Sequence, residues 1–389
     1  MSSFTAYSKK LLRCTLFVSL LVLGAGQRTD VPSEVFLARA ADLTLTEVFR
    51  IGDEAAGDTV LFGGDIEVAV DSRGQLYVTD RGIAGIRVFS NTGDLMRRIG
   101  RAGDGPGEFR GTPLVHVGSQ DTVYTLDTEA NRLTLFAPNN FSSVETIDIS
   151  GTETVNAEIK TLRYAQSLVG VVKDGFLVRF EDEIIPLISE MDAPEHVVLK
   201  LLNRNGNVSL DTIVQMPKRD LIHARTGGQS VMTIKFPFAR DVFIVLSPDN
   251  LLYYGRNDEI EIQVRSIDGN TNRSIHVPHD PVPVTEVERN IWLSTYPDAQ
   301  HELRSVFPET RPAYEALILD DSERIWLRLS APKGAVEVRW IVVNLEGRIQ
   351  ATTELPSTVW LKAIAGNRAF GTSSDEQGVP FVVAYEITP

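Results

Sequence analysis

The sequence predicts an all-β protein, a six-bladed β-propeller, on three observations. A unit of about forty to fifty residues recurs along the chain, apolar and polar residues alternate within each unit, and turns rich in glycine, asparagine and aspartate separate the alternating runs. Alternation with a period of two indicates half-buried antiparallel strands. Repeated units of this length, each forming a small sheet, are typical of propellers.

The repeat is clearest in its first two units. GQLYVTD (74–80) aligns with DTVYTLD (121–127) at an offset of 127 minus 80, or 47 residues, and IAGIRVF (83–89) aligns with ANRLTLF (130–136) at the same offset. Weaker copies bring the total to six blades, and they lie at 175–208, 250–269, 323–348 and 365–387.

The two ends of the chain are predicted to share one blade. The last unit stops before an outermost strand can form, whereas FRIGDEAAGDTVLF (49–62) resembles RRIGRAGDGPGEF (97–109) and lacks inner strands of its own. The N-terminal segment should therefore complete the last blade, which would close the ring and remove two exposed sheet edges.

The glycine-rich run GRAGDGPGEFRGTP (100–113) is interpreted as a junction between blades. Glycine permits the positive φ angles that a tight crossing from an outer strand to the next inner strand requires. A phosphate-binding loop would instead carry a lysine and be followed by a helix, and neither feature is present here.

Residues 285–307 interrupt the strand pattern and predict a helical insertion between blades 4 and 5. Thr285 and Glu288 have the spacing of a capping box, and Val287, Ile291, Leu303 and Val306 recur at helical spacing. Two roles remain open for this insertion: a lid over one mouth of the ring, or packing against a blade edge.

Residues 1–26 have the layout of a secretory signal peptide. Lys9, Lys10 and Arg13 precede an apolar run at 16–23, and small residues follow it. Because the run is shorter than the ~20 residues that cross a bilayer, we expect cleavage, with no membrane anchor afterwards. The expected mature chain, 27–389, is one propeller domain without cysteine, in a periplasmic or extracellular location.

The charge of the chain counts against nucleic acid as a partner, because 38 basic and 52 acidic residues give a formal net charge of −14. Against this background, residues 218–240 form a local basic run. His223, Arg225, Lys235 and Arg240 are its candidate ligand-binding residues, since guanidinium groups can hold a carboxylate or a phosphate. Alternatively, the run is solvated or pairs with acids at 181–183.

The sequence marks no catalytic residues and no metal ligands, because none of the motifs of common hydrolases, calcium loops or phosphate loops is present, and it leaves the cofactor unknown. His276 and His279 could reach one metal ion, but no third ligand is evident. Asp80 and Asp127 end equivalent strands and are interpreted as turn-capping residues that accept hydrogen bonds from backbone N–H groups.

Residues 69–109 resemble a repeat of the NHL class, whose units run through a valine-aspartate, a glycine turn, two strands and a glycine-rich junction. The resemblance is specific over 66–149 and weak afterwards. With RPAYEALILDDSERIWLR (311–328), the whole chain is similar to exported bacterial six-bladed β-propeller proteins. That resemblance implies a ring of six blades and implies no activity, because NHL-like propellers include binding modules as well as metal-dependent lyases and lactonases.

Two functions therefore remain. The favoured one is a binding or scaffold module that holds a protein or a small-molecule ligand at one mouth of the propeller. The alternative is a metal-dependent propeller hydrolase or lyase with its site at the central channel, which would need side chains converging from distant blades. The sequence does not indicate which mouth is used or the oligomeric state.

Overall fold

The computed structural model describes residues 40–52, 60–138, 140–156, 161–184, 195–218, 221–226, 230–235, 237–297 and 300–389. All of them belong to one compact unit, Pro32–Pro389. The predicted signal peptide, residues 1–26, lies outside the described residues.

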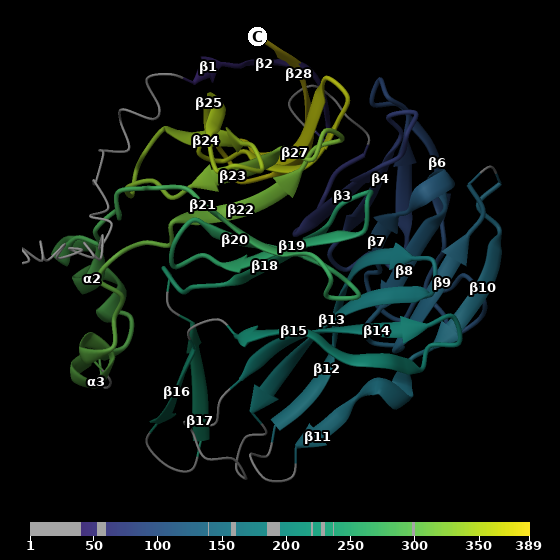
Figure 1. The fold of residues 1–389 in the computed structure, drawn as a ribbon, viewed down its shortest axis with the longest axis horizontal. Coiled ribbons are helices and arrows are strands. Elements are labelled where there is room, and N and C mark those ends of the chain that lie inside the picture. The colour runs from purple at the N-terminus through teal and green to yellow at the C-terminus, as the bar shows by residue number, and fades with distance from the viewer. Residues whose placement is uncertain are drawn as a thin grey trace, which may run out of the picture. The chain divides into compact units, whose positions relative to one another are not determined.

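Six sheets follow one another around a central axis (Figure 1). Blade 1 consists of β3 (Ile66–Val70), β4 (Leu76–Asp80), β5 (Ile86–Phe89) and β6 (Leu95–Ile99). Blade 2 consists of β7 (Leu114–Val117), β8 (Val123–Asp127), β9 (Arg132–Phe136) and β10 (Ser143–Asp148). Blade 3 consists of β11 (Thr154–Asn156), β12 (Thr161–Val172), β13 (Gly175–Ile184), β14 (His196–Asn203) and β15 (Val208–Pro217). Short 3-10 turns at Ser119–Asp121 and Ser150–Thr152 lie between them.

Blade 4 consists of β18 (Val242–Leu246), β19 (Leu251–Arg256), β20 (Glu261–Ser266) and β21 (Asn272–His276). Blade 5 consists of β22 (Tyr314–Leu319), β23 (Ile325–Leu329), β24 (Glu337–Val343), β25 (Ile349–Pro356) and β1 (Ala41–Asp42). Blade 6 consists of β26 (Trp360–Ala365), β27 (Arg368–Ser374), β28 (Pro380–Thr388) and β2 (Thr44–Ile51). The innermost strands β3, β7, β12, β18, β22 and β26 contact one another in cyclic order, and β26 contacts β3 to complete the ring.

The N-terminal strand closes this ring as the sequence predicts. β2 pairs antiparallel with β28, from Thr44 opposite Thr388 to Ile51 opposite Val382, and becomes the outermost strand of blade 6. β1 adds a short parallel pairing to β25 of blade 5, which the sequence does not predict. The first described residues therefore link two neighbouring blades.

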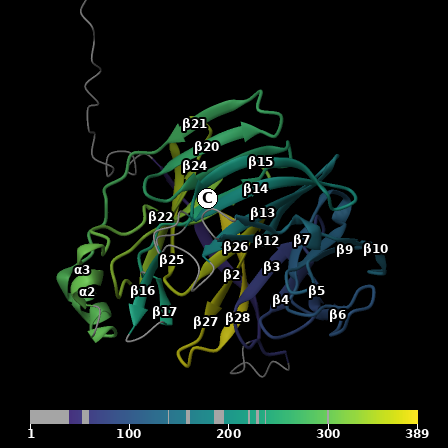
Figure 2. The same ribbon diagram turned by 90° about the horizontal axis from the view of Figure 1, so that it is seen from below.

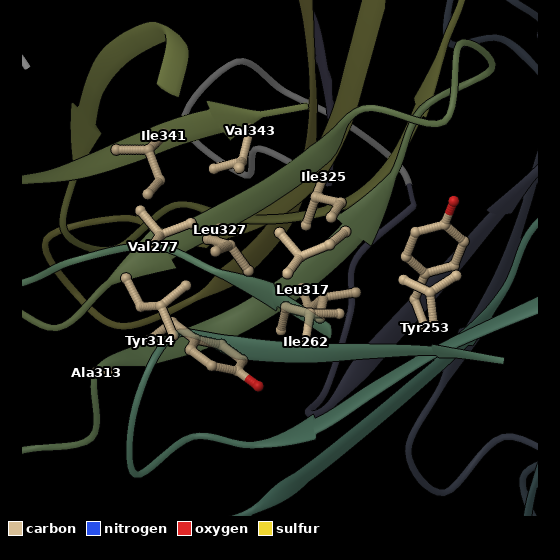
Figure 3. Packing of buried hydrophobic residues seen from close by; sticks show 13 residues of the cluster. Tyr253, Ile262, Val277, Ala313, Tyr314, Leu317, Ile325, Leu327, Ile341 and Val343 are labelled. Atoms are coloured by element: carbon tan, nitrogen blue, oxygen red, sulfur yellow. The ribbon is translucent and has the colours of Figure 1, made fainter. Parts of the chain in front are cut away.

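Each interface between neighbouring blades has its own cluster of buried apolar side chains among the described residues. Figure 3 shows the cluster between blades 4 and 5, where Tyr253 and Ile262 of one sheet lie against Leu317 and Leu327 of the next. These faces are apolar on both sides because a propeller sheet is covered by a blade on each face, so the central strands are buried almost completely.

The glycine-rich run is a blade junction that runs from β6 to β7. Gly100 has a φ of +77°, and the ring of Phe109 lies where a Cβ of residue 100 would be. The N-terminal segment repeats this contact, because Phe62 occupies the corresponding space beside Gly52, whose φ is +93°. The similarity of 49–62 to 97–109 thus reflects one shared packing motif, a phenylalanine ring seated on a left-handed glycine.

Two insertions lie beside each other at the edge of the ring (Figure 2). A hairpin of β16 (Leu221–Thr226) and β17 (Ser230–Lys235) precedes blade 4, and the helices α2 (Glu286–Leu293) and α3 (Gln300–Ser305) precede blade 5. Leu293 and Leu303 of the helices pack with Ile234 of β17 in a small separate core. Within the described ranges, neither helix has the length and apolar character needed to cross a membrane.

The predicted helical insertion and its capping box are confirmed: Thr285 accepts a hydrogen bond from the backbone N–H of Glu288, and the Glu288 carboxylate accepts one from the backbone N–H of Thr285. The predicted apolar face differs from the observed one. Leu303 is buried, but Val287, Ile291 and Val306 are half or more exposed, because the helices pack on the hairpin through their other side.

We predict that Gly100→Ala destabilises the fold more than Gly82→Ala. Both glycines have φ near +80°, which costs alanine about 1 kcal/mol, but a Cβ at residue 82 meets open space whereas one at residue 100 overlaps the Phe109 ring. The overlap should add about 1–3 kcal/mol. Urea unfolding of both variants measures the difference, and equal loss of unfolding free energy would contradict the packing role of Gly100.

Candidate functional site

The predicted basic cluster lies partly outside what the structure describes. His223 and Arg225 lie on β16, opposite Thr233 and Val231 of β17, and Lys235 lies opposite Leu221 on the same hairpin. The side chains of His223, Arg225 and Lys235 are outside the described part of the structure, so their role in anion binding stays a prediction.

The two described cations of this run have protein partners. Arg240 donates hydrogen bonds to the backbone oxygens of Phe238 and Thr310 and to Thr310 Oγ1, at 2.8–3.1 Å. Lys218 lies 3.4 Å from Glu181, as the alternative interpretation of the basic run expects. Arg240 therefore fixes the segment after β17 to the segment before blade 5.

A cavity of about 540 Å³ lies between helix α2, the segment after β17 and blades 5 and 6. We call it the aromatic pocket, because its walls are mainly aromatic and apolar and include Phe238, Ile291, Trp292, Pro332, Val338 and Trp360. It forms at the starts of the innermost strands, since Trp360 is the first residue of β26. Its size and lining are those of pockets that hold organic ligands.

Two buried arginines line the aromatic pocket, each stacked on an aromatic ring. The guanidinium of Arg328 lies 3.9 Å from the Trp360 ring centre and that of Arg311 lies 4.3 Å from the Phe238 ring centre. Arg328 is paired with Glu315 and donates to the backbone oxygen of Ser357 at 2.8 Å. Burial lowers the pKa of Arg328 to about 10, so the side chain remains charged at neutral pH.

The capping glutamate joins the helical insertion to this site. Glu288 accepts hydrogen bonds from Thr285 through one carboxylate oxygen and from Arg311 through the other. Burial opposes ionisation of Glu288, but the Thr285 hydrogen bonds and the Arg311 charge outweigh it and hold the pKa of Glu288 below its usual value. The start of helix α2 is thereby fixed to the wall of the aromatic pocket.

The cations of this pocket differ in exposure. Arg311 and Arg328 are each more than nine-tenths buried, and their enclosed Nε–H groups have no hydrogen-bond partner among the described residues. Lys333 is exposed on the pocket lining and forms no ion pair with the described residues. The arrangement can therefore accept a ligand with an apolar body and an anionic group, because apolar walls and three cations line one cavity.

A second cavity, of about 1090 Å³, lies at the opposite ends of the innermost strands. We call it the polar funnel, because turns from all six blades surround it, including residues 71–74, 116–118, 171–173, 246–248, 321 and 366–368. Asp71, Asp121 and Asp321 supply its acids, and Arg73, Lys173, Arg204 and Arg368 supply its cations.

Asp80 and Asp127 cap turns, as predicted. Asp80 accepts hydrogen bonds from the backbone N–H groups of Gly63 and Gly64, and Asp127 accepts one from the backbone N–H of Arg110. These bonds tie each second strand to the preceding blade junction. Asp80 also forms a buried ion pair with Arg87 at 2.6 Å.

The described residues hold no group of three or more histidine, cysteine, aspartate or glutamate side chains placed to bind a metal ion. His276 is exposed on β21, and His279 lies 3.7 Å from Glu259. The structure therefore brings no third ligand to this pair within its described part.

Sequence reasoning did not find the aromatic pocket. Its residues come from segments between 237 and 360 that carry no shared motif, and only the fold brings them together. One signal was present: Arg328 directly follows Ile325, Trp326 and Leu327, an apolar run typical of a buried strand, and an arginine there must find a partner inside the protein.

His116 lines the polar funnel, and we predict that it makes the stability of the fold depend on pH. Burial lowers the pKa of His116 from 6.5 to about 4. Between these pH values the unfolded chain binds a proton that the folded protein does not, so the fold loses stability as the pH falls through this window. We expect His116→Gln to be more stable relative to the native sequence at pH 4.5 than at pH 7.5. Urea unfolding at both pH values tests this, and an unchanged difference would contradict it.

Residues 57–169 match a family described as a 6-bladed beta-propeller. No curated protein sequence matches the chain. Among solved structures, a Bacteroides fragilis protein proposed to be exported is 12% identical, with 93% of this chain and 98% of that chain covered and a TM-score of 0.48. Virginiamycin B lyase from Staphylococcus aureus is 10% identical, with 88% and 99% covered and a TM-score of 0.41. The family match and the six observed sheets agree that this chain is a six-bladed β-propeller.

Proposed function

We propose that the protein is an exported binding module that holds a small organic ligand in the aromatic pocket. Export is supported by the basic, apolar and small-residue pattern of residues 1–26. Binding is supported by a rigid ring on which one asymmetric insertion builds one wall of an apolar cavity.

One observation carries this proposal: two buried arginines, stacked on Phe238 and Trp360, line an apolar cavity of about 540 Å³. The aromatic walls can hold a planar apolar body, and the cations of the lining can attract an anionic group that the ligand carries.

The charged residues that line the aromatic pocket indicate which class of ligand fits it. Glu315 balances Arg328, and Glu288 balances Arg311, so Lys333 leaves the lining with one positive charge in excess. An aromatic or other apolar carboxylate fits this balance better than a cation, which would meet two arginines at the wall.

We predict that 8-anilinonaphthalene-1-sulfonate binds the mature protein at one site, because it combines aromatic rings with an anionic group. Trp360→Ala should weaken the affinity about tenfold or more, which corresponds to about 1.4 kcal/mol, since the variant removes a pocket wall and the surface on which Arg328 stacks. Fluorescence titration measures the change, and Ile291→Ser should weaken binding in the same direction.

Val306→Ser is the matched control. Val306 belongs to the same insertion and is as exposed as Ile291, but it does not line the aromatic pocket. If Trp360→Ala binds the probe as the native protein does, or if Val306→Ser loses as much affinity as Ile291→Ser, the proposed site is wrong. Urea unfolding of each variant separates loss of binding from loss of the fold.

A further inference from the structure

The polar funnel differs from the aromatic pocket in position and chemistry. The turns at its rim follow the innermost strands, whereas the aromatic pocket lies at the starts of those strands. Its lining combines charged side chains from blades 1, 2, 3, 5 and 6 in a single cavity. A ligand at this mouth would therefore be recognised by charge and hydrogen bonds.

The carboxylates of the polar funnel accept hydrogen bonds that stabilise its turns. The buried Asp71 carboxylate accepts from the backbone N–H groups of Arg73 and Gln75 and from the Tyr77 hydroxyl. Asp121 reaches from blade 2 to blade 1 and accepts from the backbone N–H and the hydroxyl of Ser72, both at 2.9 Å. These contacts use acceptor positions that a cationic ligand would need.

Asp321 has a similar role between blades 5 and 6, because it accepts from the backbone N–H of Gly366 at 2.6 Å. Gln120 and Asp121 have φ of +63° and +56°, which is uncommon for residues other than glycine. The bonds from Ser72 to Asp121 lie within this turn and connect it to blade 1.

Three cations of the funnel have no acidic partner within the described residues. Arg204 donates to the backbone oxygens of Val172 and Lys173, at 2.6 and 3.1 Å, and Arg368 donates to the backbone oxygen of Asn91 at 2.6 Å. Carbonyl oxygens orient these guanidinium groups without neutralising them, and Lys173 forms no ion pair with a described residue. Four cations and three acids line the funnel, so the charge of its lining is positive by one.

The three cations also approach the funnel from opposite sides. Lys173 and Arg204 belong to turns of blade 3, and Arg368 begins β27 of blade 6, which is the blade opposite in a ring of six. Guanidinium groups bind carboxylate and phosphate oxygens in a paired geometry. In a chain of net charge −14, such a local excess of cations would focus anions at this mouth.

We propose that the polar funnel is a second binding site, which takes a small anion carrying carboxylate or phosphate groups. Arg204 and Lys173 of blade 3 and Arg368 of blade 6 supply its cations. The site is independent of the aromatic pocket and of the function proposed for it.

Isothermal titration calorimetry of the mature protein with citrate and with tripolyphosphate tests this site. We expect saturable binding of at least one anion, weaker at higher salt because the contacts are ionic. Arg204→Gln and Arg368→Gln should each lower the affinity about tenfold or more, since each removes a charged donor from the anion. At residue 204 the glutamine amide lies near the position of Nε, which donates to the backbone oxygen of Lys173, and urea unfolding of both variants separates loss of binding from loss of the fold.

Arg339→Gln is the control, because Arg339 is exposed on β24, paired with Glu354, and does not line the funnel. Tighter binding of tripolyphosphate would identify a phosphate ligand, and tighter binding of citrate a carboxylate ligand. Trp360→Ala should bind the anion as the native protein does. The proposal is overturned if neither anion gives saturable heat, or if both funnel variants bind like the native protein.

Discussion

The pairing of β2 with β28 is the interaction on which the rest of the structure depends. Without it, the last blade would present an unpaired outer edge and the first residues would leave the ring. The pairing also brings Ile51 into the apolar cluster that joins Phe370 of blade 6 to Phe62 and Ile66 of blade 1. A ring closed in this way holds six innermost strands at fixed positions, and both cavities form at the ends of those strands.

The repeated sheets form the ring, and an insertion that departs from the repeat forms one wall of the aromatic pocket. The aromatic pocket exists because α2 and the segment after β17 cover one mouth beside blades 5 and 6, while Glu288 and Arg311 connect that insertion to the ring. The polar funnel arises from ordinary turns, and its character depends on which turns carry arginine or lysine. One rigid scaffold thus presents an apolar site and a charged site at opposite ends of the same strands.

The fold could be predicted from local signals because each of them acts over a short distance. The strand alternation, the capping box at Thr285 and the repeated junctions at Gly52 and Gly100 all correspond to observed elements. The prediction that Asp80 and Asp127 accept hydrogen bonds from backbone N–H groups is also confirmed, because equivalent positions in repeats have equivalent surroundings.

The candidate sites could not be predicted in the same way. Arg204 and Arg368 are isolated in the sequence, and only the ring places them around one cavity. The basic run at 218–240 predicts an anion-binding site because its charges are adjacent in sequence. Arg240 and Lys218, however, contact protein groups. Helical spacing likewise misplaced Val287 and Ile291, since periodicity gives the apolar face of a helix without showing what covers it.

We propose that an apolar anion binds in the aromatic pocket. Crystals of the mature protein soaked with 4-iodobenzoate would test this most directly, because the anomalous scattering of iodine locates the ligand without assumptions about affinity. We expect an iodine peak between Trp360 and helix α2, with the carboxylate directed toward the buried arginines. An iodine peak in the polar funnel alone, or no peak in a pocket that is open in the crystal, would contradict it.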